Sequence, residues 1–109
     1  MSFQTPTPID FHLFYSALCA MRDLPYCNET SFCIEGEPNF RDCWLGCLQG
    51  NKPYWIGLSN GPQDLNYASA QELVDAKVFH GKSLRDLWPS VRFFTIGDID
   101  PMEWLANHI

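Results

Sequence analysis

The chain has 109 residues, which is room for one domain with a single modest core, and 46% of them are hydrophobic, which excludes a disordered chain. Thirteen Asp and Glu outnumber seven Lys and Arg, so the formal net charge is −6. This balance disfavours nucleic acid as a partner, because phosphate binding needs clustered basic residues, and it suits either simple solubility or a basic protein partner. We expect residues 1–109 to form a single domain in which residues 1–6 are a loose end.

Four segments begin in the way that helices begin: a capping residue is followed three positions later by an acid, whose charge suits the positive end of the helix dipole. They start at Thr7, Ser69, Ser83 and Asp100, and they predict helices at about 8–22, 70–77, 84–88 and 101–107. Pro89 should end the third helix, because a proline disfavours the helical conformation in the residue before it. In the first helix the apolar spacing predicts one buried face, made of Phe11, Phe14, Tyr15, Leu18, Cys19 and Met21.

Strands are predicted between these helices. Residues 31–35 alternate between apolar and other side chains, and residues 91–96 are β-branched and aromatic. Between them the chain reads almost as its own mirror image around residues 50–51. A two-residue turn there places Trp44 opposite Gly57 and Trp55 opposite Gly46. An indole that lies over a bare glycine backbone stabilises a sheet at that point.

The order helix, three-strand meander, two short helices, strand and helix is typical of an α+β fold. We predict a mainly antiparallel four-stranded sheet, made of the meander plus one later strand, packed with an N-terminal helix and short C-terminal helices. One face of this sheet should be covered by the first and last helices.

The predicted hairpin places apolar side chains on both faces of the sheet, whereas an antiparallel sheet with one solvated face normally shows polar residues there. Either the first helix covers one face and the C-terminal helices cover the other, or one face meets a partner. Trp and Tyr are enriched in interface hot spots. The candidate binding residues are therefore Trp44, Trp55, Tyr54 and Leu48. One face would carry Cys43, Leu45, Cys47, Tyr54, Ile56 and Leu58, and the other Trp44, Leu48, Pro53 and Trp55.

Four of the five cysteines, Cys27, Cys33, Cys43 and Cys47, are candidate metal ligands, but none forms the CxxC pair typical of structural zinc. In the predicted hairpin Cys43 and Cys47 lie four residues apart, or about 13 Å at ~3.3 Å per residue, which is too far to share one ion. In a helix the same two residues would be neighbours, so the zinc hypothesis requires the hairpin to be absent. We expect no metal and no cofactor, with buried cysteines acting as small hydrophobic residues.

A cysteine nucleophile would need a nearby histidine. His12, His80 and His108 are available, and His12 shares the predicted first helix with Cys19. Exposed or hydrogen-bonded histidines explain them better. Residues 81–83 match the end of a phosphate-binding loop, but an alanine stands where that motif requires its first glycine. We therefore expect no catalytic residue.

The first residues contain neither the basic nor the apolar region of a secretory signal, and no apolar run approaches the ~20 residues that span a bilayer. We expect a cytoplasmic protein without membrane contact, whose cysteines are reduced.

Several short motifs occur in the C-terminal half: YWIG at 54–57, ELVDA at 72–76, FHGKSL at 79–84, LW at 87–88 and DPMEWL at 100–105. In these motifs the chain resembles short uncharacterised proteins of Gram-positive gut bacteria. The resemblance implies a bacterial, non-secreted domain. Its motifs carry no known chemistry, so they assign no functional residue.

These features predict a small acidic protein-interaction module without catalysis, such as an inhibitor, an immunity-type protein or an adaptor. One alternative is a thiol- or metal-dependent activity that uses the cysteines and a histidine. Another is homodimerisation through the exposed face or edge of the sheet.

Overall fold

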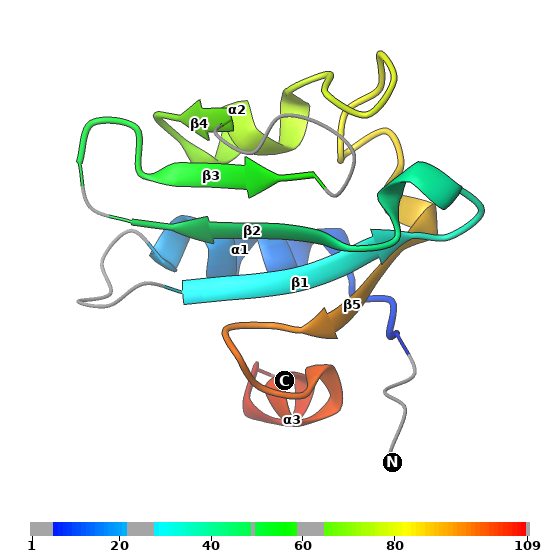
Figure 1. Ribbon diagram of the computed structural model, residues 1–109. Helices are drawn as coiled ribbons and strands as arrows, with labels where there is room; N and C mark the ends of the chain where they lie inside the picture. Colours follow the sequence, from blue (N-terminus) through cyan, green and yellow to red (C-terminus); the bar gives the residue numbers. More distant parts are fainter. Residues whose placement is uncertain (1–5, 22–27, 49, 59–64, 109) are drawn as a thin grey trace.

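One antiparallel sheet of five strands, in the order β4-β3-β2-β1-β5, organises the chain (Figure 1). The computed structural model describes residues 6–21, 28–48, 50–58 and 65–108. Helices and sheet together make an α+β fold, as predicted. The elements in chain order are α1 (Phe11–Ala20), β1 (Asn28–Ile34), η2 (Pro38–Phe40), β2 (Cys43–Cys47), β3 (Tyr54–Gly57), β4 (Leu65–Tyr67), α2 (Ala70–Asp75), η3 (Trp88–Ser90), β5 (Val91–Thr95) and α3 (Pro101–His108).

The register of the β2–β3 hairpin is the predicted one. Trp44 pairs with Gly57 and Trp55 with Gly46, and both glycines are buried. Because successive side chains of a strand point to opposite faces, this register fixes the face of each residue in the hairpin.

The sheet has one strand more than the predicted four. The additional strand, β4, is only three residues long and pairs with β3 at the edge of the sheet. Three residues are too few to show a periodicity. Residues 59–62 have the sequence Ser-Asn-Gly-Pro, which is typical of a turn, and they lie outside the described residues.

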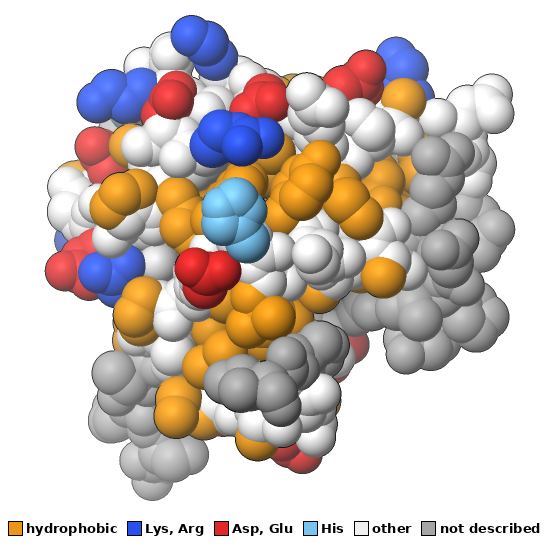
Figure 2. Space-filling model, turned by 180° about the vertical axis from the view of Figure 1, so that it is seen from behind, with side chains coloured by type: hydrophobic (Ala, Val, Ile, Leu, Met, Phe, Trp, Pro, Cys, Tyr) orange, Lys and Arg blue, Asp and Glu red, His pale blue; other side chains and the backbone are white. Residues whose placement is uncertain are grey.

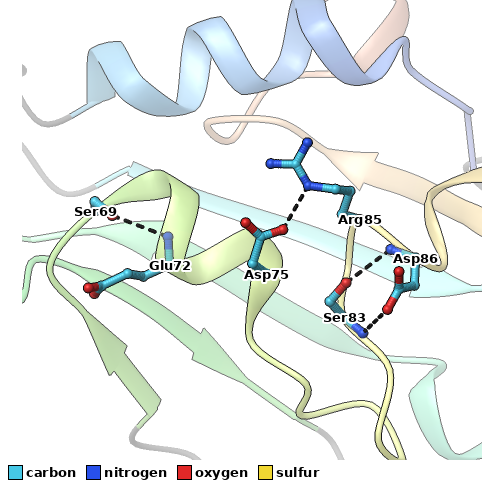
Figure 3. A network of polar contacts seen from close by, with 6 residues as sticks. All are labelled: Ser69, Glu72, Asp75, Ser83, Arg85 and Asp86. Carbon is cyan, nitrogen blue, oxygen red and sulfur yellow. Dashed lines mark hydrogen bonds and ion pairs between the residues drawn. The ribbon is translucent and has the colours of Figure 1, made fainter.

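The four predicted helix starts do not all cap a helix in the same way; Figure 3 shows those at Ser69 and Ser83. Ser69 accepts a hydrogen bond from the Glu72 N–H and caps α2, as its position predicts. Asp100 accepts one from the Met102 N–H at the start of α3. At α1, Asp10 is itself the cap, because its carboxylate accepts from the Leu13 N–H. Thr7, the predicted cap, instead pairs with Phe93 at the outer edge of β5.

The helix predicted at 84–88 forms a turn followed by the 3-10 segment η3. Ser83 and Asp86 still form a reciprocal box, in which each side chain accepts from the other's N–H (Figure 3). The hydrogen bond from the Ser83 N–H, together with the nearby Ser83 hydroxyl, lowers the pKa of the Asp86 carboxyl. Pro89 follows too closely for an α-helix to propagate beyond this first turn.

All three helices pack on the same face of the sheet. Phe14 of α1 lies 4.7 Å from Phe93 of β5 and 6.4 Å from Trp104 of α3, measured between ring centroids. Leu73 of α2 is buried in the same core. The first and last helices therefore cover the same face of the sheet, as predicted, and this face is here called the core face. The alternative prediction, in which the C-terminal helices cover the face opposite α1, is wrong, because Trp104 of α3 packs beside α1.

Candidate functional site

The sheet face opposite the helices, here called the open face, carries the two hairpin tryptophans. The register aligns Trp55 with Gly46 and Glu29 across three strands, and Trp44 with Gly57 and Ser31. Neither indole belongs to the hydrophobic core or to the partly buried residues packed against it. Each tryptophan thus lies beside a glycine of the neighbouring strand, and its indole adds apolar area to the open face.

Trp44 and Leu48 are the exposed part of this surface. Their relative exposures are 38% and 50%, and Met102 on α3, at 62%, is the third large hydrophobic residue of comparable exposure among the described residues. Leu48 directly follows β2 and is four residues after Trp44, so both side chains are on the same face of the sheet. Two exposed apolar side chains on a sheet face form the kind of surface that an interaction site requires.

Trp55 is partly buried, and its indole nitrogen is fully enclosed. This Nε1 has no hydrogen-bond partner in the structure. A buried indole N–H without an acceptor is unfavourable by about 1–3 kcal/mol. Trp55 therefore contributes apolar area to the open face, and its polar group is not offered to a partner.

Tyr54, the fourth predicted binding residue, lies on the other face. Its ring is only 2% exposed, and its hydroxyl donates to the Leu18 and Cys19 carbonyls at 3.0 and 3.1 Å. The last carbonyls of a helix lack partners within the helix. Tyr54 satisfies these at the end of α1, so it connects the helix to the sheet and is unavailable at the surface.

The open face ends in a cleft that sequence reasoning missed. This cleft, of about 490 Å³, lies between the turn after β1 and strand β5. Gly36, with a φ of 85°, lets the chain turn there, and the Glu37 N–H closes the turn on the Ile34 carbonyl at 3.1 Å. On β5 the pairing register shifts opposite residues 31 and 32, which leaves Phe94 as an extra residue that lines the cleft. The Gly-Glu-Pro-Asn sequence of residues 36–39 is typical of a turn, but a bulge leaves no local sequence signal.

The cysteines are separated by the fold. Cys43 and Cys47 are buried on the core face, Cys19 is exposed on α1, and Cys33 is partly buried in the cleft. Burial and the nearby Glu35 carboxylate raise the pKa of the Cys33 thiol. Cys27 lies outside the described residues. Within the described ranges, no three His, Cys, Asp or Glu residues are grouped so that they could hold a metal ion.

The described histidines pack against aromatic rings. His12 lies on the exposed side of α1 next to Phe11, with ring centroids 5.7 Å apart. His80 has a φ of 54° in a tight turn and lies 5.0 Å from the Phe40 ring. The side chain of His108 is outside the described set.

A second apolar surface lies on the helix side of the molecule, where hydrophobic side chains gather around a histidine (Figure 2). Its rings are packed on one another: the Phe11 centroid is 5.1 Å from that of Trp88 and 5.6 Å from that of Tyr15. The Arg85 guanidinium lies 4.8 Å from the Phe11 centroid, and the Trp88 Nε1 donates to the Ile9 carbonyl. The three aromatic side chains are only partly exposed and pack against the core, so they form its border.

Comparison with family models, curated proteins and solved structures finds no match for this chain. The resemblance to bacterial proteins therefore stays a prediction. Among the described residues, no helix has the length and apolar character needed to cross a membrane.

Proposed function

We propose that this chain is a non-catalytic protein-interaction module whose contact surface is the open face of the sheet, centred on Trp44, Leu48 and Trp55. One observation carries the proposal. Trp44 and Leu48 are exposed on a sheet face that none of the three helices covers, although a helix-packed core is present on the other face.

The surface has the composition expected of a binding hot spot. Trp is enriched in such sites because it brings a large, rigid area at a low cost in conformational entropy. Trp55 and the two glycines paired with the tryptophans, Gly46 and Gly57, extend the contact area beyond Trp44 and Leu48. Partner binding would remove the exposed indole and isobutyl groups from water, which supplies the driving force.

The charge of the chain favours a partner with basic residues around an apolar patch. The net charge is −6, and Glu29 on β1 and Asp42 before β2 are exposed near the tryptophans. Opposite charges at the border of an interface raise the association rate and select among partners.

An alternative thiol-based activity finds less support. Cys43 and Cys47 are enclosed by the core, and the raised pKa of Cys33 lowers the fraction of nucleophilic thiolate near neutral pH.

The test is affinity capture from cells of the native host with three forms of the chain: the wild type, a Trp44→Ser/Leu48→Ser variant, and Met102→Ser. Met102 is the matched control, since it is an exposed apolar residue on α3. We expect a defined protein to be retained by the wild type and by Met102→Ser and to be lost with the double variant. Circular dichroism should show equal folding of all three.

Retention of the same protein by the double variant would contradict the assignment of the open face. Light scattering at two concentrations separates a second outcome. A wild-type dimer that the double variant dissociates would assign the open face to self-association in place of a different partner.

A further inference from the structure

The cleft at the end of the open face combines an apolar wall with charged groups that have no ionic partner. Its apolar lining comes from Phe94, Pro38 and Cys33. The bulge in β5 directs Phe94 to this position, and Pro38 begins η2, whose last residue, Phe40, is buried against Phe79 with ring centroids 5.1 Å apart. One side of the cleft is therefore fixed by Phe40 in the core, and the other is fixed by the pairing of β5 with β1.

One ion pair at the cleft is already complete. Glu35 lies 3.3 Å from the Arg92 Nε, and Arg92 also donates to the Pro89 and Val91 carbonyls at 2.9 Å each. Glu35 therefore already has a cationic partner, and that guanidinium is also bound to two backbone carbonyls.

Arg41 and Glu37 are different. Both line the cleft, yet within the described part of the chain neither forms an ion pair, with the other or with any other residue. The cleft consequently offers one free positive and one free negative group beside an apolar wall. A nucleotide or another polyanion does not suit it, because Glu35 and Glu37 would repel the phosphates.

We propose that this cleft binds a small zwitterion with an apolar side chain, namely a hydrophobic amino acid or a short hydrophobic peptide. Its carboxylate would meet Arg41, its ammonium group would meet Glu37, and its side chain would lie against Phe94 and Pro38. A guanidinium is well suited to a carboxylate because it can donate two parallel hydrogen bonds. The cleft volume is within the ~300–1,000 Å³ common for small-ligand sites.

The proposal does not depend on the open face as a protein-binding surface. A Trp44→Ser/Leu48→Ser variant should bind the zwitterion as the wild type does. Failure of one proposal is therefore distinguishable from failure of the other.

The test is an NMR titration of ¹⁵N-labelled protein with L-leucine, leucyl-leucine, leucinamide and N-acetylleucine. We expect saturable shifts of the Cys33, Gly36 and Phe94 amides with L-leucine or leucyl-leucine. The stronger of these two identifies the source of the zwitterion as a free amino acid or a peptide. Leucinamide lacks the carboxylate and N-acetylleucine lacks the ammonium group, so each should bind about tenfold more weakly or worse, as expected for loss of a charge-assisted hydrogen bond.

Variants assign each charge to its partner. Arg41→Gln should weaken leucine binding about tenfold and leave leucinamide binding unchanged. Glu37→Gln should also weaken leucine binding about tenfold, and it should leave N-acetylleucine binding unchanged. Asp42→Asn is the control, because Asp42 is an exposed acid next to Arg41 that does not line the cleft. The proposal is overturned if no ligand shifts these amides up to about 10 mM, or if leucinamide and N-acetylleucine bind as well as leucine.

Discussion

Neighbouring residues of β2 show how differently the two faces of the sheet are covered. Leu45 is fully enclosed beneath the helices, whereas Trp44, one residue earlier, faces away from them and is partly exposed. Both faces are apolar along the hairpin, yet α1, α2 and α3 all pack on one of them. A small chain with three short helices can bury one face of a five-stranded sheet. The exposed apolar residues on the second face, Trp44 and Leu48, then form the surface that we propose for binding.

The largest expected difference between the faces is in stability. Leu45→Ala should lower the free energy of unfolding by about 3–5 kcal/mol, because it leaves a cavity in the enclosed core. Trp44→Ala should cost about 1 kcal/mol or less, since much of the indole is already in water. Urea unfolding of both variants measures the difference. Equal losses would mean that the open face is covered in solution.

Trp88 on the helix side and Trp55 on the open face allow the hydrogen bonding of an indole N–H to be compared between the two sides. Trp88 donates from its Nε1 to the Ile9 carbonyl at 2.7 Å, whereas the buried Nε1 of Trp55 has no acceptor. Trp→Phe removes similar apolar area at both sites but breaks a hydrogen bond at only one. We expect Trp88→Phe to be about 1–2 kcal/mol more destabilising than Trp55→Phe in thermal or urea unfolding. If Trp55→Phe were the more damaging change, its indole would have an acceptor in solution.

The smallest expected difference is in the alkylation rates of the cysteines, which lie at different places on the two sides of the sheet. Cys19 is exposed and should react with iodoacetamide before the other three described cysteines near neutral pH. Cys33 should react several-fold more slowly, because its raised pKa keeps the thiol protonated, and its rate should continue to rise as the pH passes the ordinary thiol value of about 8.5. Cys43 and Cys47, on the core face, should react only after unfolding. Peptide mass mapping assigns each site, and fast labelling of Cys43 in the native protein would contradict the closed core.

The hairpin register could be predicted from sequence because it depends on a local pattern. Two tryptophans and two glycines at mirrored positions leave one favourable alignment, and β2 and β3 adopt it. Helix starts at Ser69 and Asp100 were equally local, because a cap needs only its own first turn.

The remaining features depend on contacts between distant segments. An apolar stripe on α3 shows that this helix packs, but Trp104 selects its face of the sheet by meeting α1. The short strand β4 exists because β3 offers it an edge. The cleft needs the bulge at Phe94 and the turn at Gly36 to lie side by side, although 58 positions separate them in the sequence. For the same reason, three of the four predicted binding residues lie on the open face, whereas Tyr54 is buried beneath α1.

Site-specific photo-cross-linking tests the central claim most directly. A photoreactive amino acid at position 48, on the open face, is compared with the same residue at position 102, on α3, in cells of the native host. The account predicts a discrete cross-linked protein at position 48 that is absent at position 102. It also predicts that Trp44→Ser abolishes the product without changing the thermal unfolding midpoint by more than a few degrees. Equal cross-linking at both positions, or a product insensitive to Trp44→Ser, would contradict the open face as the interaction surface of this protein.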